Sequence, residues 1–302
     1  MINNYSSAPV CLFVYKRHDT LKHTIASLLE NELAPFTDIH IFSDAAACDA
    51  DIENVNAVRN YIRALKGFKS VFVYLSEKNN GLAQSIIDGV SKIVNTAGRV
   101  IVLEDDLIVS RNFLNFMNEA LTAYENNLKI FSVSGYSSPV KVQFACDVYY
   151  TRRASSWGWA TWKNRWEEID WTVPDFEQFS KDREKQNKFN KMGSDLTHML
   201  KKQMNGRINS WAIRWVYHQF KYDLLTVFPL VSKVSNNGFH KDATHTAKND
   251  ESRFSTYLDE SNQTNFNFSP RPYLDKNILK QFVAPYTIKT RVLYKIKSLL
   301  HL

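Results

Sequence analysis

Cysteine is scarce in this sequence of 302 residues, which contains only Cys11, Cys48 and Cys146. The three are far apart, odd in number and without CxxC spacing, so they indicate neither a disulfide framework nor a zinc site. Long hydrophobic runs are also lacking: no stretch of about 18 apolar residues occurs, and no basic segment followed by an apolar one opens the chain. These absences indicate a reducing compartment, and we expect a cytoplasmic protein.

Positive charge exceeds negative charge, giving a formal net charge of +7. Such a balance suits an anionic partner, whether a nucleotide, a nucleic acid or an acidic membrane surface. The segment 276–302 has six Lys or Arg residues and no Asp or Glu, so it accounts for most of the excess. Because these basic residues belong to a tail with an apolar face and do not interleave with aromatics along a groove, we expect no nucleic-acid partner.

The first 135 residues alternate short β-branched or aromatic runs with longer amphipathic stretches. This alternation predicts an α/β fold with a mostly parallel sheet flanked by helices. Strands are expected over residues 10–15, 38–43, 70–76 and 99–103. Helices are expected over residues 19–30, 51–66, 82–96 and 111–125.

The composition changes near residue 140, since all seven tryptophans fall between Trp157 and Trp215 and the strand–helix alternation fades. We therefore predict one subdomain over 1–140 and a second over 141–275. A basic tail follows over 276–302.

An acidic triplet, Glu104-Asp105-Asp106, comes directly after the buried strand 99–103. Ligands of such sheets bind at the carboxyl ends of the strands, and three adjacent carboxylates repel one another unless a cation compensates them. Hard oxygen ligands suit Mg²⁺ or Mn²⁺, which bridge diphosphate oxygens and neutralise a departing nucleoside diphosphate. The alternative is a solvated acidic turn before the next helix.

The segment Val-Leu-Glu-Asp-Asp-Leu-Ile-Val-Ser-Arg-Asn-Phe-Leu around this triplet, followed by Phe-Ser-Val-Ser-Gly-Tyr ending at Tyr136, resembles a known family. It is similar to N-acetylglucosaminyltransferase I and bacterial family 2 glycosyltransferases, over roughly residues 8–140. The resemblance implies the GT-A fold, with a nucleotide-sugar-binding subdomain over 1–140 and an acceptor-binding or catalytic subdomain over 141–275. It makes the triplet a variant of the Asp-x-Asp motif. It further implies that Asp106 is the main metal ligand, that Asp105 contacts ribose or metal, and that Glu104 faces the donor sugar.

The same resemblance assigns donor contacts to two other strand ends. Arg17, after the first strand, matches an arginine that reaches the donor diphosphate, and Asp44 matches an aspartate that reads the uracil imide. A carboxylate is the appropriate acceptor for an imide N–H, so a UDP-sugar donor is expected, although Asp44 is also a common turn residue. Asn80 and Gly81 would bring backbone close to the nucleoside, or simply form a turn before the next helix.

The tryptophan-rich region has two interpretations. Trp157 and Trp159, like Trp211, could stack on the C–H face of a donor or acceptor sugar, as the resemblance to bacterial relatives suggests. Large aromatics also dominate protein cores, so packing is an equally good interpretation of each.

The general base is the point at which the sequence departs from the family. Asn209 and Ser210 occupy the position where inverting members place an aspartate before a tryptophan-bearing helix, and neither serves as a base near neutral pH. A Gly-bearing polar loop at 235–246 offers His240, Asp242 and His245 instead. We rank Asp242 and His245 first, with His245 a further metal or diphosphate ligand, and place Asp195 and Asp223 behind them.

The pattern of apolar and basic residues over 287–302 predicts a basic amphipathic helix. Its apolar positions share one face, with Lys289 at the edge: Ile288, Val292, Leu293, Ile296, Leu299 and Leu300. Such a helix suits the surface of an anionic membrane, and the alternative is docking on its own domain or on another subunit.

These observations together predict an inverting glycosyltransferase. It would move a sugar from a nucleotide donor, expected to be a UDP-sugar, to a hydroxyl of a surface polysaccharide or lipid-linked glycan, peripherally at the cytoplasmic face of the inner membrane. One alternative is a non-catalytic donor-binding protein that has lost its base. A sugar nucleotidyltransferase is a second alternative, but the first strand is not followed by the glycine-rich loop of those enzymes.

Overall fold

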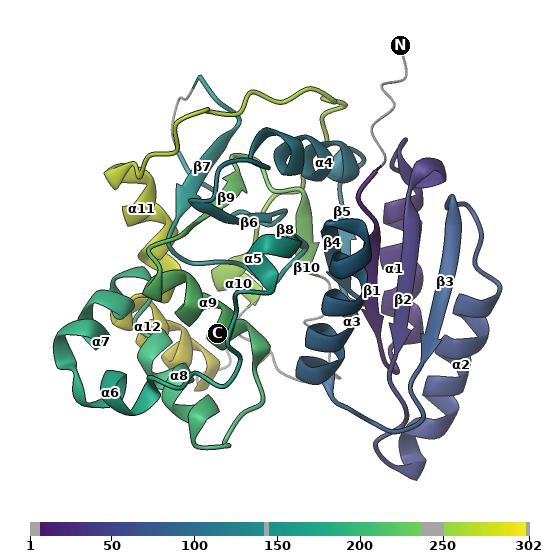
Figure 1. Cartoon of the computed structure of the whole chain (residues 1–302), viewed down its shortest axis with the longest axis horizontal. Coiled ribbons are helices and arrows are strands. Elements are labelled where there is room, and N and C mark those ends of the chain that lie inside the picture. Colours follow the sequence, from purple (N-terminus) through teal and green to yellow (C-terminus); the bar gives the residue numbers. More distant parts are fainter. Residues whose placement is uncertain (1–6, 142–144, 237–250, 300–302) are drawn as a thin grey trace.

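The computed structural model describes residues 7–141, 145–236 and 251–299. An eight-stranded mixed sheet runs through this part of the chain in the order β3-β2-β1-β4-β8-β6-β9-β7, and helices flank it (Figure 1). A second ribbon pairs β5 (Leu107–Val109) with β10 (Val234–Asn236). The predicted fold class, a mostly parallel mixed sheet flanked by helices with a C-terminal helix, is confirmed.

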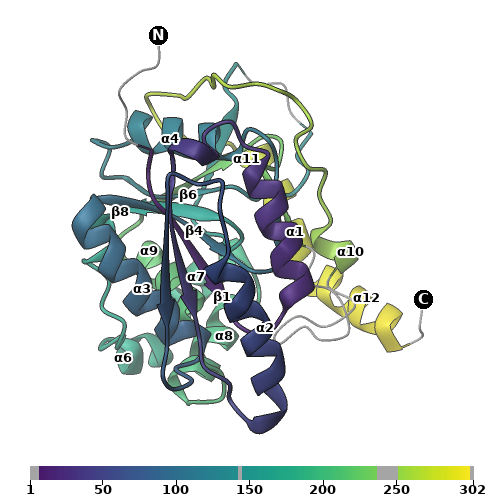
Figure 2. The same cartoon turned by 90° about the vertical axis from the view of Figure 1, so that its right-hand side faces the viewer.

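The first four strands of the large sheet are parallel and alternate with helices. They are β1 (Val10–Val14), α1 (His18–Leu29), β2 (Asp38–Ser43), α2 (Ile52–Arg63), β3 (Ser70–Leu75), α3 (Leu82–Ala97) and β4 (Arg99–Glu104). Alternate residues of β1 point to opposite faces: Leu12 belongs to the core formed with α1 and α2, whereas Phe13 belongs to the core formed with α3. Figure 2 shows α3 on one side of the sheet and α1 with α2 on the other.

The remaining elements are shorter and complete the sheet. The strands are β6 (Ile130–Ser134), β7 (Val148–Thr151), β8 (Trp159–Trp162) and β9 (Leu225–Pro229). The helices of four or more residues are α4 (Phe113–Ala123), α5 (Lys163–Trp166), α6 (Phe176–Lys181), α7 (Arg183–Phe189), α8 (Leu196–Met204), α9 (Trp211–Lys221), α10 (Glu251–Phe254), α11 (Lys276–Val283) and α12 (Ile288–Leu299). Short 3₁₀ turns lie at 34–36, 49–51, 190–192 and 284–286.

The large sheet takes strands from both sides of residue 140. β8 lies antiparallel between β4 and β6, and β6 pairs in parallel with β9. The division into 1–140 and 141–275 therefore remains a proposal about ligand binding, because the backbone hydrogen bonds of the sheet cross it.

Within the described ranges, no helix combines the length and the apolar character needed to span a bilayer.

Candidate functional site

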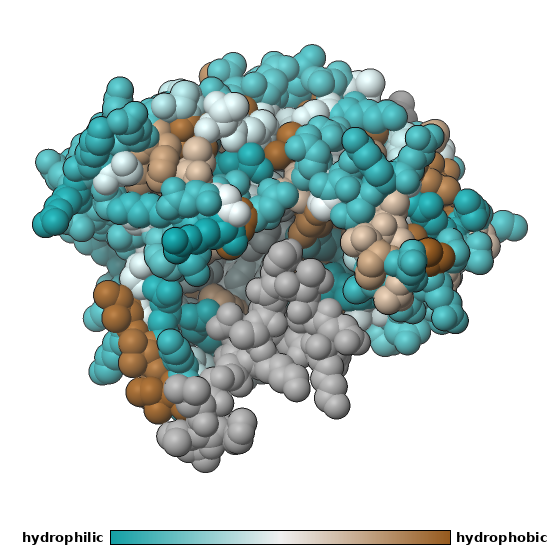
Figure 3. Space-filling model, turned by 90° about the horizontal axis from the view of Figure 1, so that it is seen from below, coloured by the Kyte–Doolittle hydropathy of each residue, from teal (hydrophilic) through white to brown (hydrophobic). Residues whose placement is uncertain are grey.

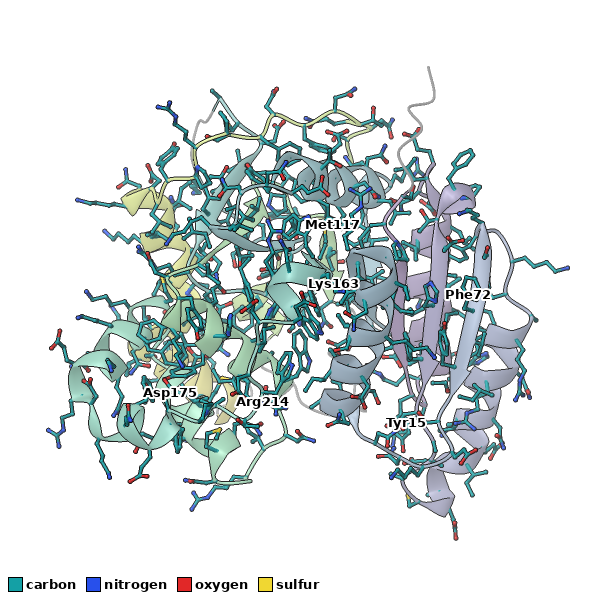
Figure 4. The ribbon with its side chains drawn as sticks, viewed as in Figure 1. Tyr15, Phe72, Met117, Lys163, Asp175 and Arg214 are labelled. Atoms are coloured by element: carbon teal, nitrogen blue, oxygen red, sulfur yellow. The ribbon has the colours of Figure 1, made fainter. Side chains whose placement is uncertain are left out.

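The candidate site lies where β1 and β4 end side by side. These strands are parallel neighbours with Phe13 opposite Glu104, so the residues that follow them meet at one edge of the sheet. Arg17 lies between two carboxylates there: one guanidinium nitrogen donates to Asp105, and Nη1 donates to Asp106 Oδ2 at 2.9 Å. The Tyr15 N–H also donates to Asp105 Oδ2 at 3.2 Å. Figure 4 marks the place by Tyr15, at the lower end of β1.

The electrostatics of this edge are strongly perturbed. Burial raises the pKa of Asp105 to about 6, although Arg17 opposes the shift. Burial, with the charges of Asp106 and then Asp105, raises the pKa of Glu104 to about 8. Burial would lower the pKa of Arg17, but the two aspartates outweigh it and raise that pKa above its ordinary value. Arg17 therefore pairs with two of the three adjacent carboxyl groups, and Glu104 holds its proton more tightly than a free glutamate does.

Arg17 changes the argument made from the sequence for a metal. The sequence indicates a metal ion because three adjacent carboxylates repel one another, whereas the structure places a protein cation against two of them. The raised pKa of Glu104, about 8, keeps that carboxyl largely protonated at neutral pH, so Arg17 offsets one of the two charges of its ion-pair partners. A cation is still attracted to the remaining negative charge.

The carboxylates of this edge suit Mg²⁺ or Mn²⁺ that takes its other ligands from a phosphate and water. Among the described residues, no three His, Cys, Asp or Glu side chains form a ready metal cage. Mg²⁺ bound with a substrate commonly uses one or two carboxylates and takes its other ligands from phosphates and water. Asp106 and Asp105 supply carboxylates of this kind.

Asp44, at the end of β2, holds the loop that precedes α3. Its Oδ1 accepts hydrogen bonds from the N–H groups of Ala45 (2.9 Å) and Asn80 (3.0 Å), and its Oδ2 accepts one from the N–H of Gly81 (2.8 Å). Gly81 has φ 74° at the start of α3, a left-handed conformation that glycine adopts without strain. The Asp44 carboxylate therefore holds the turn formed by Asn80 and Gly81, and most of its hydrogen bonds are accepted from backbone N–H groups.

A second cluster near this edge, formed by Tyr15, Lys16 and Asp51, was missed by the sequence reasoning. Asp51 accepts from the Tyr15 hydroxyl at 2.6 Å and from Lys16 Nζ at 2.7 Å, and the Ala47 N–H donates to Tyr15 Oη at 2.8 Å. Hydrogen bonds from Lys16 and Tyr15 lower the pKa of Asp51, while burial and Asp51 raise the pKa of Tyr15 to about 12. The cluster fixes the 44–51 loop beside β1. In the sequence, the one sign of this cluster is Lys16, which stands next to Arg17 after the first strand.

Asn209 and Ser210, which the resemblance sets at the position of the base, have different surroundings. A Cβ atom at Gly81 would lie 4.0 Å from Asn209 Nδ2, so the exposed Asn209 lies close to the start of α3. Ser210 is the N-cap of α9, where its hydroxyl accepts from the Ile213 N–H at 3.4 Å. Asn209 is therefore near the loop that Asp44 holds, whereas Ser210 has a helix-capping role.

Two of the three tryptophans expected as a sugar platform are core residues. Trp159 and Trp211 are 1% and 3% exposed, and their ring centroids lie 5.1 Å apart. Trp159 also packs on Trp166 and Trp215, with centroids at 5.5 and 4.4 Å. Neither ring has a face open to a sugar, so the platform interpretation is corrected to core packing for both. Trp157 is half-buried, with its ring edge-on to Tyr136, and stays a candidate.

Of the other candidate bases, Asp195 and Asp223 lie within the described residues. His240, Asp242 and His245 lie outside the described residues. Asp195 forms two hydrogen bonds with Arg153, at 2.9 and 2.8 Å, and Asp223 pairs with Lys129 and Arg152. Both are engaged in ion pairs away from the triplet.

Comparison with known proteins gives only distant similarities. No family model matches the sequence, and no curated protein matches it. Among solved structures, a mannosyltransferase from Pyrobaculum calidifontis in complex with GDP-Man and Mn²⁺ is 12% identical with a TM-score of 0.41, over 72% of this chain and 70% of that one.

Two further similarities are of the same kind. Residues 1–349 of TarS from S. aureus are 10% identical with a TM-score of 0.33, over 51% of this chain and 47% of that one. A UDP-glucose pyrophosphorylase complexed with UDP-glucose is 11% identical with a TM-score of 0.37, over 74% of this chain and 90% of that one. At these values the similarities assign neither a family nor an activity.

Proposed function

We propose that this protein is a metal-dependent glycosyltransferase that binds a nucleoside diphosphate sugar at the carboxyl ends of β1, β2 and β4. The observation that carries the proposal is Arg17 held between Asp105 and Asp106. A guanidinium binds a diphosphate through paired hydrogen bonds, and adjacent carboxylates bind the divalent cation that accompanies it. The edge thus holds both groups that a metal–diphosphate complex requires.

We propose UDP as the nucleotide. Support comes from the position of Asp44 at the end of β2 and from the loop that it organises with Asn80 and Gly81. Because the carboxylate of Asp44 already accepts backbone N–H groups, its role toward uracil would include shaping this loop. The Tyr15–Lys16–Asp51 cluster would hold the 44–51 loop in place beside the nucleoside.

The proposed reaction is a single displacement with inversion at the anomeric carbon. A bound Mg²⁺ or Mn²⁺ would supply Lewis-acid stabilisation of the departing diphosphate, and Arg17 would donate hydrogen bonds to the same oxygens. Asn209, near the start of α3, would orient the acceptor hydroxyl without taking its proton. For the general base we propose Asp242 or His245.

The acceptor is proposed to be a hydroxyl of a surface polysaccharide or lipid-linked glycan, reached at the cytoplasmic face of the inner membrane. Trp157 is the tryptophan that we retain as a contact for a sugar ring, since its ring is not fully buried.

The test is a thermal-shift screen of nucleoside diphosphates with and without Mn²⁺. Ligand at about 100 times its Kd stabilises the folded state by about 2.7 kcal/mol, which raises Tm by several degrees. We expect the largest rise for UDP with Mn²⁺ and its loss in Asp106→Ala. Asp88→Ala, which removes an exposed carboxylate on α3, is the matched control. Absence of stabilisation by every nucleotide, or stabilisation unchanged in Asp106→Ala, would refute the proposal.

One observation favours a second candidate, a donor-binding protein without catalysis. Asn209 carries an amide near the start of α3, where related enzymes would have a carboxylate. Radiolabelled UDP-sugars incubated with Mn²⁺ and a cell-envelope extract distinguish the two. Binding with neither transfer nor slow hydrolysis, across several donors, would favour the non-catalytic protein.

A further inference from the structure

The C-terminal helix α12 contacts the rest of the protein through its polar side. Arg291 Nη1 donates to Ser194 Oγ at 3.1 Å, and Thr290, Arg291 and Tyr294 are half-buried. Just before the helix, the Ser194 hydroxyl donates to the Tyr286 carbonyl at 2.7 Å, and Arg153 lies 3.7 Å from the centre of the Tyr286 ring. These contacts fix the start of α12 and its orientation against the body.

The apolar side of α12 consequently faces outward. Ile288, Val292 and Ile296 follow one another at intervals of four residues on one face, with Leu293 beside them, and these four are between 48% and 68% exposed. A helix that completes a folded domain normally buries such a face. Figure 2 shows α12 projecting from the body, and Figure 3 shows a hydrophobic strip at the edge of the surface seen from below.

Exposed lysines border this apolar strip. At about 100° per residue, Lys295 lies beside Ile288 at one edge of this strip, Lys297 lies beyond Leu293 at the other edge, and Lys289 lies between Ile296 and Leu293. All three lysines are exposed, and no acidic residue occurs between Lys276 and the last residue of the sequence. An apolar strip with lysines along both edges matches the boundary between the acyl chains and the phosphates of an anionic bilayer.

We propose that α12 binds the surface of an anionic phospholipid bilayer. Ile288, Val292 and Ile296 enter the interfacial region, and Lys295 and Lys297 contact lipid phosphates. A second copy of this chain fits less well, because facing strips would bring their lysines together. Four side chains on a 12-residue helix also fall short of the roughly 800 Å² that each partner of a stable complex buries. The inference does not depend on the proposed glycosyl transfer.

The proposal is tested by cosedimentation of the full chain with vesicles. We expect binding to phosphatidylcholine vesicles that contain about 30% phosphatidylglycerol, and little binding to phosphatidylcholine alone. Val292→Glu is expected to weaken binding about tenfold or more, because it places a charge in the apolar strip. Leu128→Glu, which adds the same charge at a site that is 64% exposed between α4 and β6, is expected to bind nearly as the wild type does.

Two further measurements separate the contributions of charge and folding. Lys295→Gln with Lys297→Gln is expected to weaken binding about fivefold for each lysine, and added salt is expected to weaken binding of the wild type likewise. Thermal unfolding of the Val292→Glu variant should match that of the Leu128→Glu variant. Failure to bind either vesicle, equal binding by the lysine variant, or a dimer in solution that Val292→Glu dissociates without any vesicle binding would overturn the proposal.

Discussion

Replacing Glu104 with glutamine is expected to make the stability of this protein less sensitive to pH. Glu104 ends β4 beside Asp105 and Asp106, and burial together with the charges of Asp106 and Asp105 raises its pKa from 4.5 to about 8. Glutamine has nearly the same shape and does not ionise. The substitution therefore isolates the cost of placing a charge at this position.

The sign of the effect follows from the direction of the shift. The folded state holds this proton more tightly than the unfolded chain does, so the contribution of Glu104 to stability is complete below pH 4.5 and is lost as the pH rises through about 8. One pKa unit corresponds to about 1.4 kcal/mol. The wild-type protein therefore loses about 3 kcal/mol by pH 7, and up to about 5 kcal/mol above pH 8, that the glutamine variant retains.

Urea unfolding at several pH values between about 5 and 8.5 measures this difference. The free energy of unfolding of Glu104→Gln minus that of the wild type should grow by about 4 kcal/mol across the range. Glu53→Gln, at an exposed position on α2, is the control, and its difference from the wild type should stay nearly constant. A difference for Glu104→Gln that does not change with pH would refute the reasoning.

Three other substitutions test the site and the core. Arg17→Ala leaves the buried Asp105 without its cation and should lower the free energy of unfolding by about 3 kcal/mol in urea, with a smaller loss for Arg17→Lys; equal losses would show that charge is not the cause. Trp159→Ala should cost about 3–5 kcal/mol of stability because the ring is buried, and a stable variant that loses only acceptor binding would restore the platform interpretation. Asn209→Asp places a carboxylate near the start of α3 and should raise the transfer rate with increasing pH through the aspartate pKa; an unchanged rate would locate the base elsewhere.

The first half of the fold was predictable because its pattern is local. Each predicted strand and helix up to residue 125 is present, with ends within three residues of those expected. Strands such as β1 are buried along their whole length and are bounded by polar turns, and the helices between them bury one face. A strand with two buried faces followed by an amphipathic helix is visible in the sequence without any long-range information.

The second half was not predictable in the same way. β8 has the sequence Trp-Ala-Thr-Trp and is buried throughout, so it shows neither the alternation of a half-exposed strand nor a long apolar run. The same residues were therefore open to two interpretations, a sugar platform and a core. Only the placement of β8 between β4 and β6 shows that Trp159 is a core residue.

The sequence indicated candidate residues at the ends of the strands but not how these residues pair. Arg17 and Asp105 are 88 positions apart, and each was identified from its place after a strand. Their contact depends on β1 and β4 being neighbours in the sheet, which is a property of the order of the strands. The local sequence around Asp105 therefore shows three carboxylates that repel one another. It does not show Arg17, which follows the neighbouring strand β1.

The position of β8 also limits how the protein can be recombined with others. β8 hydrogen-bonds to β4 and to β6, and β6 hydrogen-bonds to β9. A chimera joined at residue 140 would have to form all three of these strand pairs between segments of different origin. A chimera is therefore better made by transplanting loops and helices such as α6 to α8 onto an intact sheet than by exchanging halves of the chain.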